Sequence, residues 1–191
     1  MILADHEIRR LCRDFGMISP YLNRTVRKTK DDKPCLSYGL DPAGYDLRLK
    51  DGVLIFSADS EEIIDPKNFK ETGMIEKKLD KKTGSIILGR HTTALGHSVE
   101  RIKMPPNVWA LVVAKSTYAR CGVTLNATKI NPGWEGELVL EISNMTPRPV
   151  KIYTGEGIAS IVFFRVDPPD ALYSQLGGKY QGQSGVTLPK I

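Results

Sequence analysis

The chain between Val53 and Phe164 is a succession of short apolar or alternating runs, separated by stretches of turn-forming residues. The runs occupy residues 53–56, 85–88, 92–96, 108–114, 122–126, 137–143, 149–153 and 158–164. Clusters of glycine, proline, asparagine and aspartate interrupt them at roughly the 8–12 residue spacing typical of all-β sandwiches and barrels. Too little helical periodicity lies between the runs for a parallel α/β sheet. The pattern therefore predicts a mostly antiparallel β fold.

One short helix is expected before this region. The apolar residues between Ile8 and Phe15 follow the spacing of one helical face. Asp5 stands where it could cap the first turn, and Gly16 stands where the helix would end.

The length of 191 residues fits one compact domain, residues 1–191, with a C-terminal arm from about residue 167. After Asp167 the chain has few large aliphatic residues and cannot form much core by itself. A flexible terminus is one interpretation of this segment. The other is an arm that orders over a ligand or a neighbouring subunit, and the Gly-Lys-Tyr-Gln-Gly-Gln order favours the arm.

Composition narrows the class of protein only broadly. With 41% hydrophobic and 26% charged residues, the chain fits neither a disordered protein nor a collagen or a coiled coil. The net charge of +5 is spread along the sequence and suits an anionic small molecule as readily as nucleic acid. Three widely spaced cysteines favour a reducing cytoplasm over a disulfide framework. No apolar run approaches the ~20 residues of a membrane helix, and the N-terminus is charged where a signal peptide is apolar.

The segment KSTYARCG, residues 115–122, follows the most apolar run of the chain. Ser116 could cap a single helical turn there, and Gly122 could end it. Such a turn points free backbone N–H groups outward, and Lys115 and Arg120 add positive charge, which suits a phosphate group. An ordinary capped turn with two solvated cations is the alternative that this segment leaves open.

Glu141 is the unusual residue of the run 137–143, since it lies between Leu140 and Ile142. Because both faces of this strand are largely apolar, we expect the carboxylate to be substantially buried. Burial disfavours the charged form and raises the pKa of a carboxylate, which suits proton transfer near neutral pH. A salt-bridged structural glutamate on an edge strand is the alternative.

A third polar stretch, residues 38–49, places Asp46 and Arg48 in alternation with apolar residues. Its ordinary interpretation is a turn that enters a strand. Trp109 and Trp134 are expected in the core.

Several common signatures are absent from the sequence. A zinc-dependent nucleobase deaminase needs His-x-Glu and a later Pro-Cys-x-x-Cys, and neither occurs. His6, His91 and His97 have no partner at metal-ligand spacing. Walker A, G-x-G-x-x-G and G-x-S-x-G sequences do not occur either, so a phosphate site must be of another design.

Four stretches follow one another as DPAGYDLRL, VVAKSTYARCG, INPGWEGELVLEISN and GGKYQGQSGVTLPK. In this order they resemble the deoxycytidine triphosphate (dCTP) deaminase family, which is related in fold to the trimeric deoxyuridine triphosphatases (dUTPases). The resemblance runs from EIRR near the N-terminus to the last residues, and KSTYARCG and GGKYQGQ are long, unusual strings.

The resemblance implies a distorted β-barrel or jelly-roll subunit of the dUTPase-like type, in a homotrimer with active sites at the subunit interfaces and the arm over the bound nucleotide. The implied reaction is metal-free hydrolytic deamination of dCTP to dUTP and ammonia, which supplies the pyrimidine deoxynucleotide pathway. Mg²⁺ would be carried on the triphosphate rather than in a protein cage, and zinc is not expected. The implied partners are dCTP and dUTP, with dTTP as a candidate inhibitor, and neither nucleic acid nor a membrane.

The resemblance also assigns roles to residues. Glu141 matches the catalytic glutamate, which must take the water proton where no metal lowers the pKa of water toward ~7. Ser116 would orient the water, and Arg120 would support the glutamate and the tetrahedral intermediate. The other implied nucleotide contacts are Lys115, Thr117, Tyr118, Ala119, Asn131, Val139, Leu140, Ser160, Tyr173, Lys179 and Gln183. Asn126, Ala127 and Thr128 fall in the stretch expected to read the cytosine edge.

The chain departs from the family pattern at a few positions. Thr128, Lys129 and Asn131 replace the His, Arg and Asp of many members, and Ser160 stands where some relatives carry Gln. In the triphosphatases and the bifunctional members, the aspartate at the position of Asn131 serves as a base for triphosphate hydrolysis. An amide cannot accept that proton, so we expect deamination to stop at dUTP unless another carboxylate such as Asp46 serves.

Three alternatives remain at this point. A bifunctional dUMP-forming deaminase or a dUTP pyrophosphatase is the runner-up. A non-catalytic nucleotide-binding regulator is disfavoured by Glu141, since a buried carboxylate is costly to keep without a function. A nucleic-acid-binding barrel ranks last because no strand interleaves aromatic and basic residues.

Overall fold

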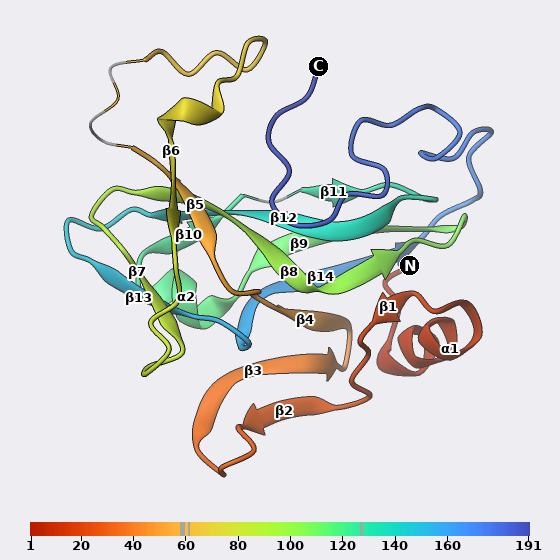
Figure 1. Ribbon diagram of the computed structural model, residues 1–191. Coiled ribbons are helices and arrows are strands. Elements are labelled where there is room, and N and C mark those ends of the chain that lie inside the picture. Colours follow the sequence, from red (N-terminus) through yellow and green to blue (C-terminus); the bar gives the residue numbers. More distant parts are fainter. Residues whose placement is uncertain (58–59, 61, 127) are drawn as a thin grey trace.

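The computed structural model describes residues 1–57, 60, 62–126 and 128–191, and it confirms a mostly β chain (Figure 1). Helix α1 (Asp5–Phe15) buries Ile8 and Cys12 and ends at Gly16, which adopts the left-handed conformation with φ 70°. The expectation that Asp5 caps this helix is wrong. Ala4 is the N-cap, and Asp5 is the first helical residue, where its negative charge still suits the helix N-terminus.

The first large sheet has the strand order β10-β12-β8-β5-β6, and β1 also pairs with β8. Its strands are β1 (Ile18–Ser19), β5 (Val53–Phe56), β6 (Met74–Lys77), β8 (Thr93–Lys103), β10 (Val123–Leu125) and β12 (Glu135–Asn144). Every second residue of β12 is buried, as the two-residue period of a strand requires when one face packs on a core. This alternation decides which side chains of β12 reach the candidate site.

The second large sheet has the order β11-β9-β14-β4-β3-β2, and a separate pair joins β13 to β7. The strands are β2 (Thr25–Lys28), β3 (Pro34–Asp41), β4 (Gly44–Arg48), β7 (Ser85–Leu88), β9 (Val108–Ala114), β11 (Lys129–Ile130), β13 (Val150–Tyr153) and β14 (Gly157–Arg165). All strand pairings are antiparallel, as the sequence predicts. The helix α2 (Ser116–Arg120) follows β9, and a 3-10 turn, η1 (Glu71–Gly73), precedes β6.

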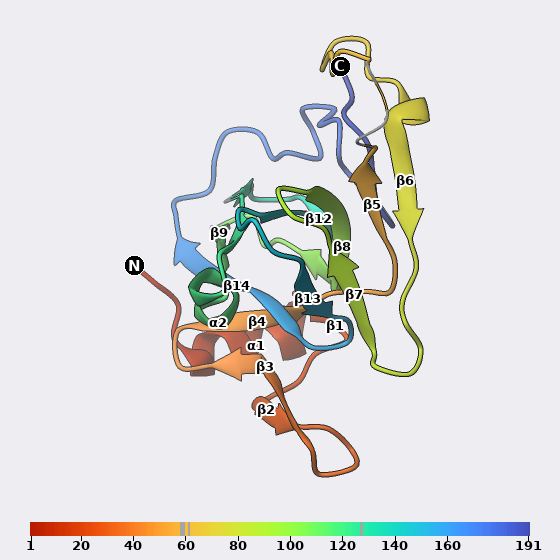
Figure 2. The ribbon, with the colours of Figure 1, turned by 90° about the vertical axis from the view of Figure 1, so that its left-hand side faces the viewer.

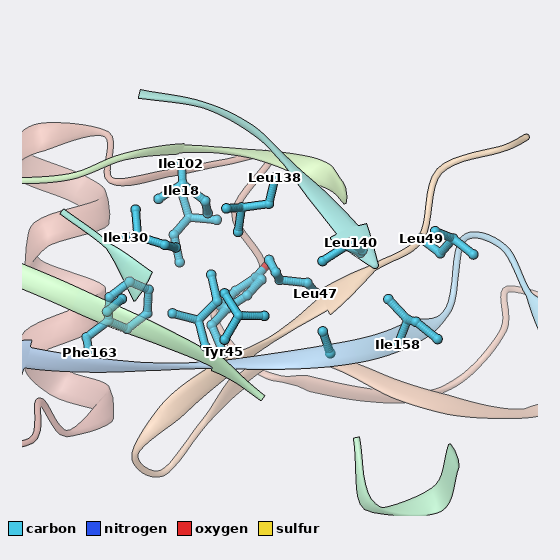
Figure 3. Close-up of a cluster of buried hydrophobic side chains, with 14 of the residues drawn as sticks. Ile18, Tyr45, Leu47, Leu49, Ile102, Ile130, Leu138, Leu140, Ile158 and Phe163 are labelled. Atoms are coloured by element: carbon cyan, nitrogen blue, oxygen red, sulfur yellow. The ribbon is translucent and has the colours of Figure 1, made fainter. Parts of the chain in front are cut away.

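The core lies between the two large sheets, which face each other in both ribbon views (Figures 1 and 2). Figure 3 shows Leu138 and Leu140 of β12 on one side and Tyr45, Leu47 and Phe163 of β4 and β14 on the other. All five side chains are at most 5% exposed. This arrangement agrees with the expected distorted dUTPase-like β fold, and the described strands do not close into a single barrel.

Residues 166–191 carry no regular helix or strand and run across the edge of β12 (Figure 1). The Gln183 carbonyl accepts a hydrogen bond from the Glu137 N–H (3.0 Å), and the Gln183 side-chain amide donates to the Glu137 carbonyl (2.7 Å). The Trp134 indole N–H donates to the Tyr180 carbonyl at 3.0 Å. The arm therefore packs on the sheet of its own chain. None of the helices in the described residues has the length and apolar character needed to cross a membrane.

Candidate active site

Glu141 is the titratable group around which the site is built. The alternation of β12 turns Leu140 into the core and Glu141 to the opposite face, where Glu141 pairs in register with Leu95 of β8. The Glu141 Oε2 atom is buried and has no hydrogen-bond partner in the described structure. Burial raises the pKa of the Glu141 carboxyl above its ordinary value, with a smaller lowering contribution from a backbone hydrogen bond. The carboxylate that we expected to be substantially buried is partly buried, and its pKa is raised as expected.

A cavity of about 320 Å³ opens beside Glu141. Its walls come from three parts of the chain: the β11–β12 region, the arm, and the apolar residues Phe56, Phe69 and Leu95. The β11–β12 region contributes Thr128, Lys129, Ile130, Asn131, Trp134, Leu138, Val139 and Glu141, and the arm contributes Tyr173, Tyr180, Gln183, Thr187 and Pro189. Mostly apolar walls with a few polar groups are typical of small-molecule sites.

The β11–β12 turn and the arm shape this cavity together. Gly133 adopts φ 78° in the turn that it forms with Pro132, where only glycine is unstrained. The Tyr173 N–H donates to the Pro132 carbonyl at 3.0 Å, which holds the arm against the turn. An added Cβ at Gly136 would lie 2.9 Å from the Trp134 ring and 3.0 Å from the Gln183 carbonyl. The arm can approach β12 this closely because residue 136 has no side chain.

The second group of predicted residues lies on α2, away from this cavity. Ser116, Thr117, Ala119 and Arg120 are exposed, and the Arg120 guanidinium donates to the Ser116 carbonyl at 3.1 Å. The prediction that Ser116 caps this turn is wrong, since Lys115 is the N-cap and no side chain caps the helix.

Tyr118 also lies on α2 but is a core residue, 5% exposed. Its hydroxyl accepts a hydrogen bond from the Tyr153 N–H at 2.8 Å, and burial raises the pKa of the Tyr118 phenol. Its side chain anchors α2 to the small sheet, so any contact it makes with a nucleotide has to come from its backbone.

The structure thus sorts the predicted residues into groups. Asn131, Val139, Glu141, Tyr173 and Gln183 line one cavity, with Thr128 and Lys129 beside them. None of the residues 115–120 is among the residues that line this cavity. Leu140 faces the core at 1% exposed, and Lys179 is exposed at the surface of the arm. Ala127 lies outside the described residues, and Asn126 is exposed next to it.

Lys115 and Ser160 belong to neither group. The Lys115 ammonium pairs with the Asp46 carboxylate, and the Ser160 hydroxyl donates to the same carboxylate. Both contacts lie inside the subunit, where the side chains of Lys115 and Asp46 are 11% and 8% exposed.

Sequence reasoning missed several walls of the cavity. Phe56 ends β5 and Phe69 lies in the β5–β6 connection, and their rings meet edge to face with centroids 6.4 Å apart. Trp134 is buried, as expected, but it also forms part of the wall. The Pro-Gly-Trp sequence and the Tyr-Gln pair of the arm carry the signal that could have placed Trp134 and Tyr180 there. Nothing in the sequence pattern brings Phe56 and Phe69 to Glu141.

Comparison with known proteins gives a consistent result. A family model described as dCTP deaminase-like matches residues 2–166. A protein named dCTP deaminase from Nautilia profundicola is 43% identical over 192 residues, covering 100% of this chain and 98% of its own. A protein of the same name from Paraburkholderia phymatum is 44% identical, with 99% and 98% covered.

The fold is also shared with a protein of known structure. It is the 2'-deoxycytidine 5'-triphosphate deaminase from Agrobacterium tumefaciens, with a TM-score of 0.59 and 21% sequence identity. The match covers 87% of this chain and 48% of that one, so this chain spans about half the length of the solved protein.

Proposed function

The chain belongs to the dCTP deaminase-like family and deaminates dCTP, and we propose that Glu141 moves the protons of this reaction. The observation that carries the proposal is the Glu141 Oε2 atom, which is buried beside a cavity with room for a small molecule and has no hydrogen-bond partner among the described residues. A carboxylate in such a place is ready to accept a proton from a water molecule. The raised pKa makes this carboxylate a stronger base than an ordinary glutamate, which suits it to take a proton from water and to pass it on.

The proposed reaction is hydrolytic and balances as dCTP plus water giving dUTP plus ammonia. Glu141 takes a proton from water while the water oxygen bonds to C4 of cytosine. The proton is delivered to N3, so that the negative charge of the addition does not build up on the ring. The C4–N4 bond then breaks, the amine leaves as ammonia with a proton relayed through Glu141, and the C4 carbonyl of uracil forms.

We propose that Ser116 and Arg120 complete this site from a second copy of the chain. Ser116 orients the water, and Arg120 stabilises the ionised Glu141 and the intermediate. In support, α2 displays both residues at the surface, whereas Glu141 faces a cavity that α2 of the same chain does not line. A homotrimer of the family type brings the two surfaces together, and dTTP is a candidate regulatory ligand of that assembly.

The triphosphate is proposed to enter as its magnesium complex, so that Mg²⁺ belongs to the substrate. The exposed ammonium of Lys179 and the arm residues Tyr173 and Gln183 are the proposed contacts of the arm with the nucleotide. The three cysteines are free thiols in the structure, which suits a reducing cytoplasm as the proposed location.

Asn131 leads us to propose that the reaction stops at dUTP. It lines the cavity with Glu141, where an amide can hydrogen-bond a sugar hydroxyl but cannot accept a proton. The other candidate base, Asp46, is already engaged with Lys115 and Ser160. A bifunctional deaminase that forms dUMP is the second candidate, and pyrophosphate release separates the two.

The test is to incubate the purified protein with dCTP and Mg²⁺ and to resolve nucleotides, ammonia and pyrophosphate over time. Wild type should accumulate dUTP without pyrophosphate. Glu141→Gln should reduce kcat by about 10²–10⁴-fold while dCTP still binds, because only the proton acceptor is lost. Glu135→Gln is the matched control, since Glu135 lies on the same face of β12 but pairs with Arg101 at 3.0 Å.

The outcomes are distinct. Substantial turnover by Glu141→Gln removes Glu141 from its proposed role. Pyrophosphate formed in step with dUMP makes the enzyme bifunctional and refutes the argument from Asn131.

A further inference from the structure

A buried ionic cluster lies under the start of α2. One carboxylate oxygen of Asp46, on β4, pairs with the Lys115 ammonium, and the other oxygen accepts a hydrogen bond from the Ser160 hydroxyl. Lys115 is the residue directly before Ser116, so the cluster is one peptide unit from the hydroxyl proposed to orient water. The resemblance placed Lys115 among the nucleotide contacts, whereas the structure directs its charge into the subunit.

The strand register brings these residues together. Asp46 and Ser160 are paired partners on β4 and β14, and Ser160 is also paired with Val113 near the end of β9. Lys115 directly follows the last residue of β9 at this end, and the methylene groups of its side chain lie over Gly157. An added Cβ at Gly157 would collide with the Ser37 carbonyl and lie 3.3 Å from the Lys115 Cε atom. Because residue 157 has no side chain, the Lys115 side chain has room to reach Asp46.

The backbone of Lys115 is held in place by hydrogen bonds as well. Its N–H donates to the Ile158 carbonyl at 3.3 Å, and its carbonyl accepts from the Ala119 N–H at 3.1 Å, which closes the first turn of α2. No side chain caps this five-residue helix. Such a short helix has little stability of its own, so its place depends on the residues that anchor it.

The cluster is costly for the fold. Burying a charge is unfavourable unless it is paired and hydrogen-bonded, and a buried ion pair is often no better for stability than apolar residues of the same size. A second carboxylate, Asp41, is close enough to the pair for both charges to influence its pKa. Its pKa is raised mainly by burial, and the Asp46 charge contributes in the same direction, while a backbone hydrogen bond from Ala43 and the Lys115 charge oppose the rise. The Asp46–Lys115 pair thus places two charges inside the subunit for little gain in stability, which indicates a role other than stability for this arrangement.

We propose that Asp46 and Ser160 are positioning residues for the deamination, which act through Lys115 to fix the first turn of α2 and the Ser116 hydroxyl. Lys115 serves as the tether of this turn and not as a phosphate ligand. The inference rests on the proposed role of Ser116. It adds two residues to the machinery that touch neither the base nor the triphosphate.

The test is the kinetics of dCTP deamination by Asp46→Asn, Lys115→Met and the double variant. Because misplacing a catalytic group by about 1 Å can cost ~10²-fold, each single change should lower kcat by about 10–10²-fold with KM within about threefold. The double variant should be no slower than the slower single one, since both changes break one tether. Lys115→Arg, which keeps a cation within reach of Asp46, should restore most of kcat.

A direct phosphate contact by Lys115 predicts a different pattern. Asp46→Asn would then free the ammonium and leave kcat unchanged, while Lys115→Met would raise KM for dCTP tenfold or more, and this result overturns the inference. If Asp46→Asn fails to fold, Ser160→Ala provides the second test, because it removes one partner of Asp46 and leaves the charges balanced. A kcat of Ser160→Ala equal to wild type also overturns the inference.

Two controls separate positioning from general loosening and from failure of the proposed function. Glu100→Gln weakens another buried ion pair, between Glu100 and Arg48 at 2.7 Å, and should lower Tm with kcat within about twofold. An equal loss of kcat in Glu100→Gln and Asp46→Asn means loosening and overturns the inference. Ser116→Ala should lose at least as much kcat as Asp46→Asn. Full activity of Ser116→Ala refutes the proposed role of Ser116 itself, whereas an inactive Ser116→Ala beside a fully active Asp46→Asn refutes only the positioning.

Discussion

The burial that suits Glu141 to proton transfer also lowers the stability of the folded chain when the carboxylate is ionised. Burial raises the pKa of its carboxyl above the ordinary value of 4.5, so the folded state prefers the protonated form. Below about pH 4.5 the group is protonated in both the folded and the unfolded chain and has no effect on their balance. As pH rises from this ordinary value toward the raised folded pKa, the unfolded chain gives up its proton before the folded chain does, and the free energy of unfolding falls.

Glu141→Gln should therefore be more stable than wild type at pH 8, and the difference should shrink as the pH falls toward 4.5. Thermal unfolding of both proteins between pH 4.5 and 8 measures it. Because the expected gain comes from removing a buried charge, Glu135→Gln, which changes a surface ion pair, should show no such gain. A Glu141→Gln variant that is less stable than wild type at pH 8 contradicts the burial argument.

Asn131 carries the second prediction at this scale. Asn131→Asp places a carboxylate in the cavity next to Glu141, where it can accept a proton from a water that attacks the triphosphate. We expect measurable pyrophosphate from this variant and none from Asn131→Ala, which has no proton acceptor. Pyrophosphate release should be followed with dUTP as substrate, so that the result does not depend on deamination. An Asn131→Asp variant that binds dUTP without releasing pyrophosphate would show that this residue does not decide the product.

Individual elements were predictable where the apolar pattern was strong. The strands β5, β7, β9 and β14 match the predicted runs to within one residue. The strands β7, β9 and β14 bury alternate or consecutive apolar side chains, and β5 buries Val53. The strand β3 was not predicted as such because its sequence, PCLSYGLD, lacks apolar alternation and its residues are mostly half-buried. The helix starts were misassigned because Asp5 and Ser116 are residue types that favour caps, whereas the caps are Ala4 and Lys115.

The arm gives the prediction that belongs to the element scale. Truncation after Asp170 removes every arm residue that lines the cavity but none of the residues that make up the buried core. We expect Tm to change little and kcat/KM for dCTP to fall by about 10²-fold or more, because the cavity loses one wall and its exclusion of water. Leu176→Ala is the control, since Leu176 lies on the arm at 70% exposed and outside the cavity wall. A truncated protein with wild-type kcat/KM would show that the arm is not part of the site.

At the scale of the whole molecule, one chain does not complete the proposed site. The sequence identified both halves, Glu141 on β12 and Ser116 with Arg120 on α2, because the residue types and their order are distinctive. It could not show that the two halves face different surfaces of the same chain, since that depends on how β9, β10 and β12 place α2 at one end of the sandwich (Figure 1). The sequence could not show for the same reason that the Lys115 side chain points into the subunit, because its partner Asp46 is 69 positions away in the chain.

Subunit mixing tests the shared site directly. Glu141→Gln and Arg120→Met should each be nearly inactive alone. When equal amounts are unfolded, mixed and reassembled, a site is intact only if Glu141 comes from an Arg120→Met chain and Arg120 comes from a Glu141→Gln neighbour. Random assembly gives each condition a probability of about one half, so the mixture should recover about one quarter of wild-type activity.

A mixture of Glu141→Gln with the double variant is the control for this experiment. It contains no intact Glu141 and must stay inactive, which excludes recovery through refolding alone. Distinct affinity tags on the two chains verify that mixed oligomers have formed. If mixed oligomers form without regaining activity, Glu141 and Arg120 act within one chain, and α2 must then move to the cavity when dCTP binds. Recovery near one quarter would instead show that each active site forms only where two subunits meet. Any change that weakens assembly should then lower activity in proportion to the number of interfaces that are lost.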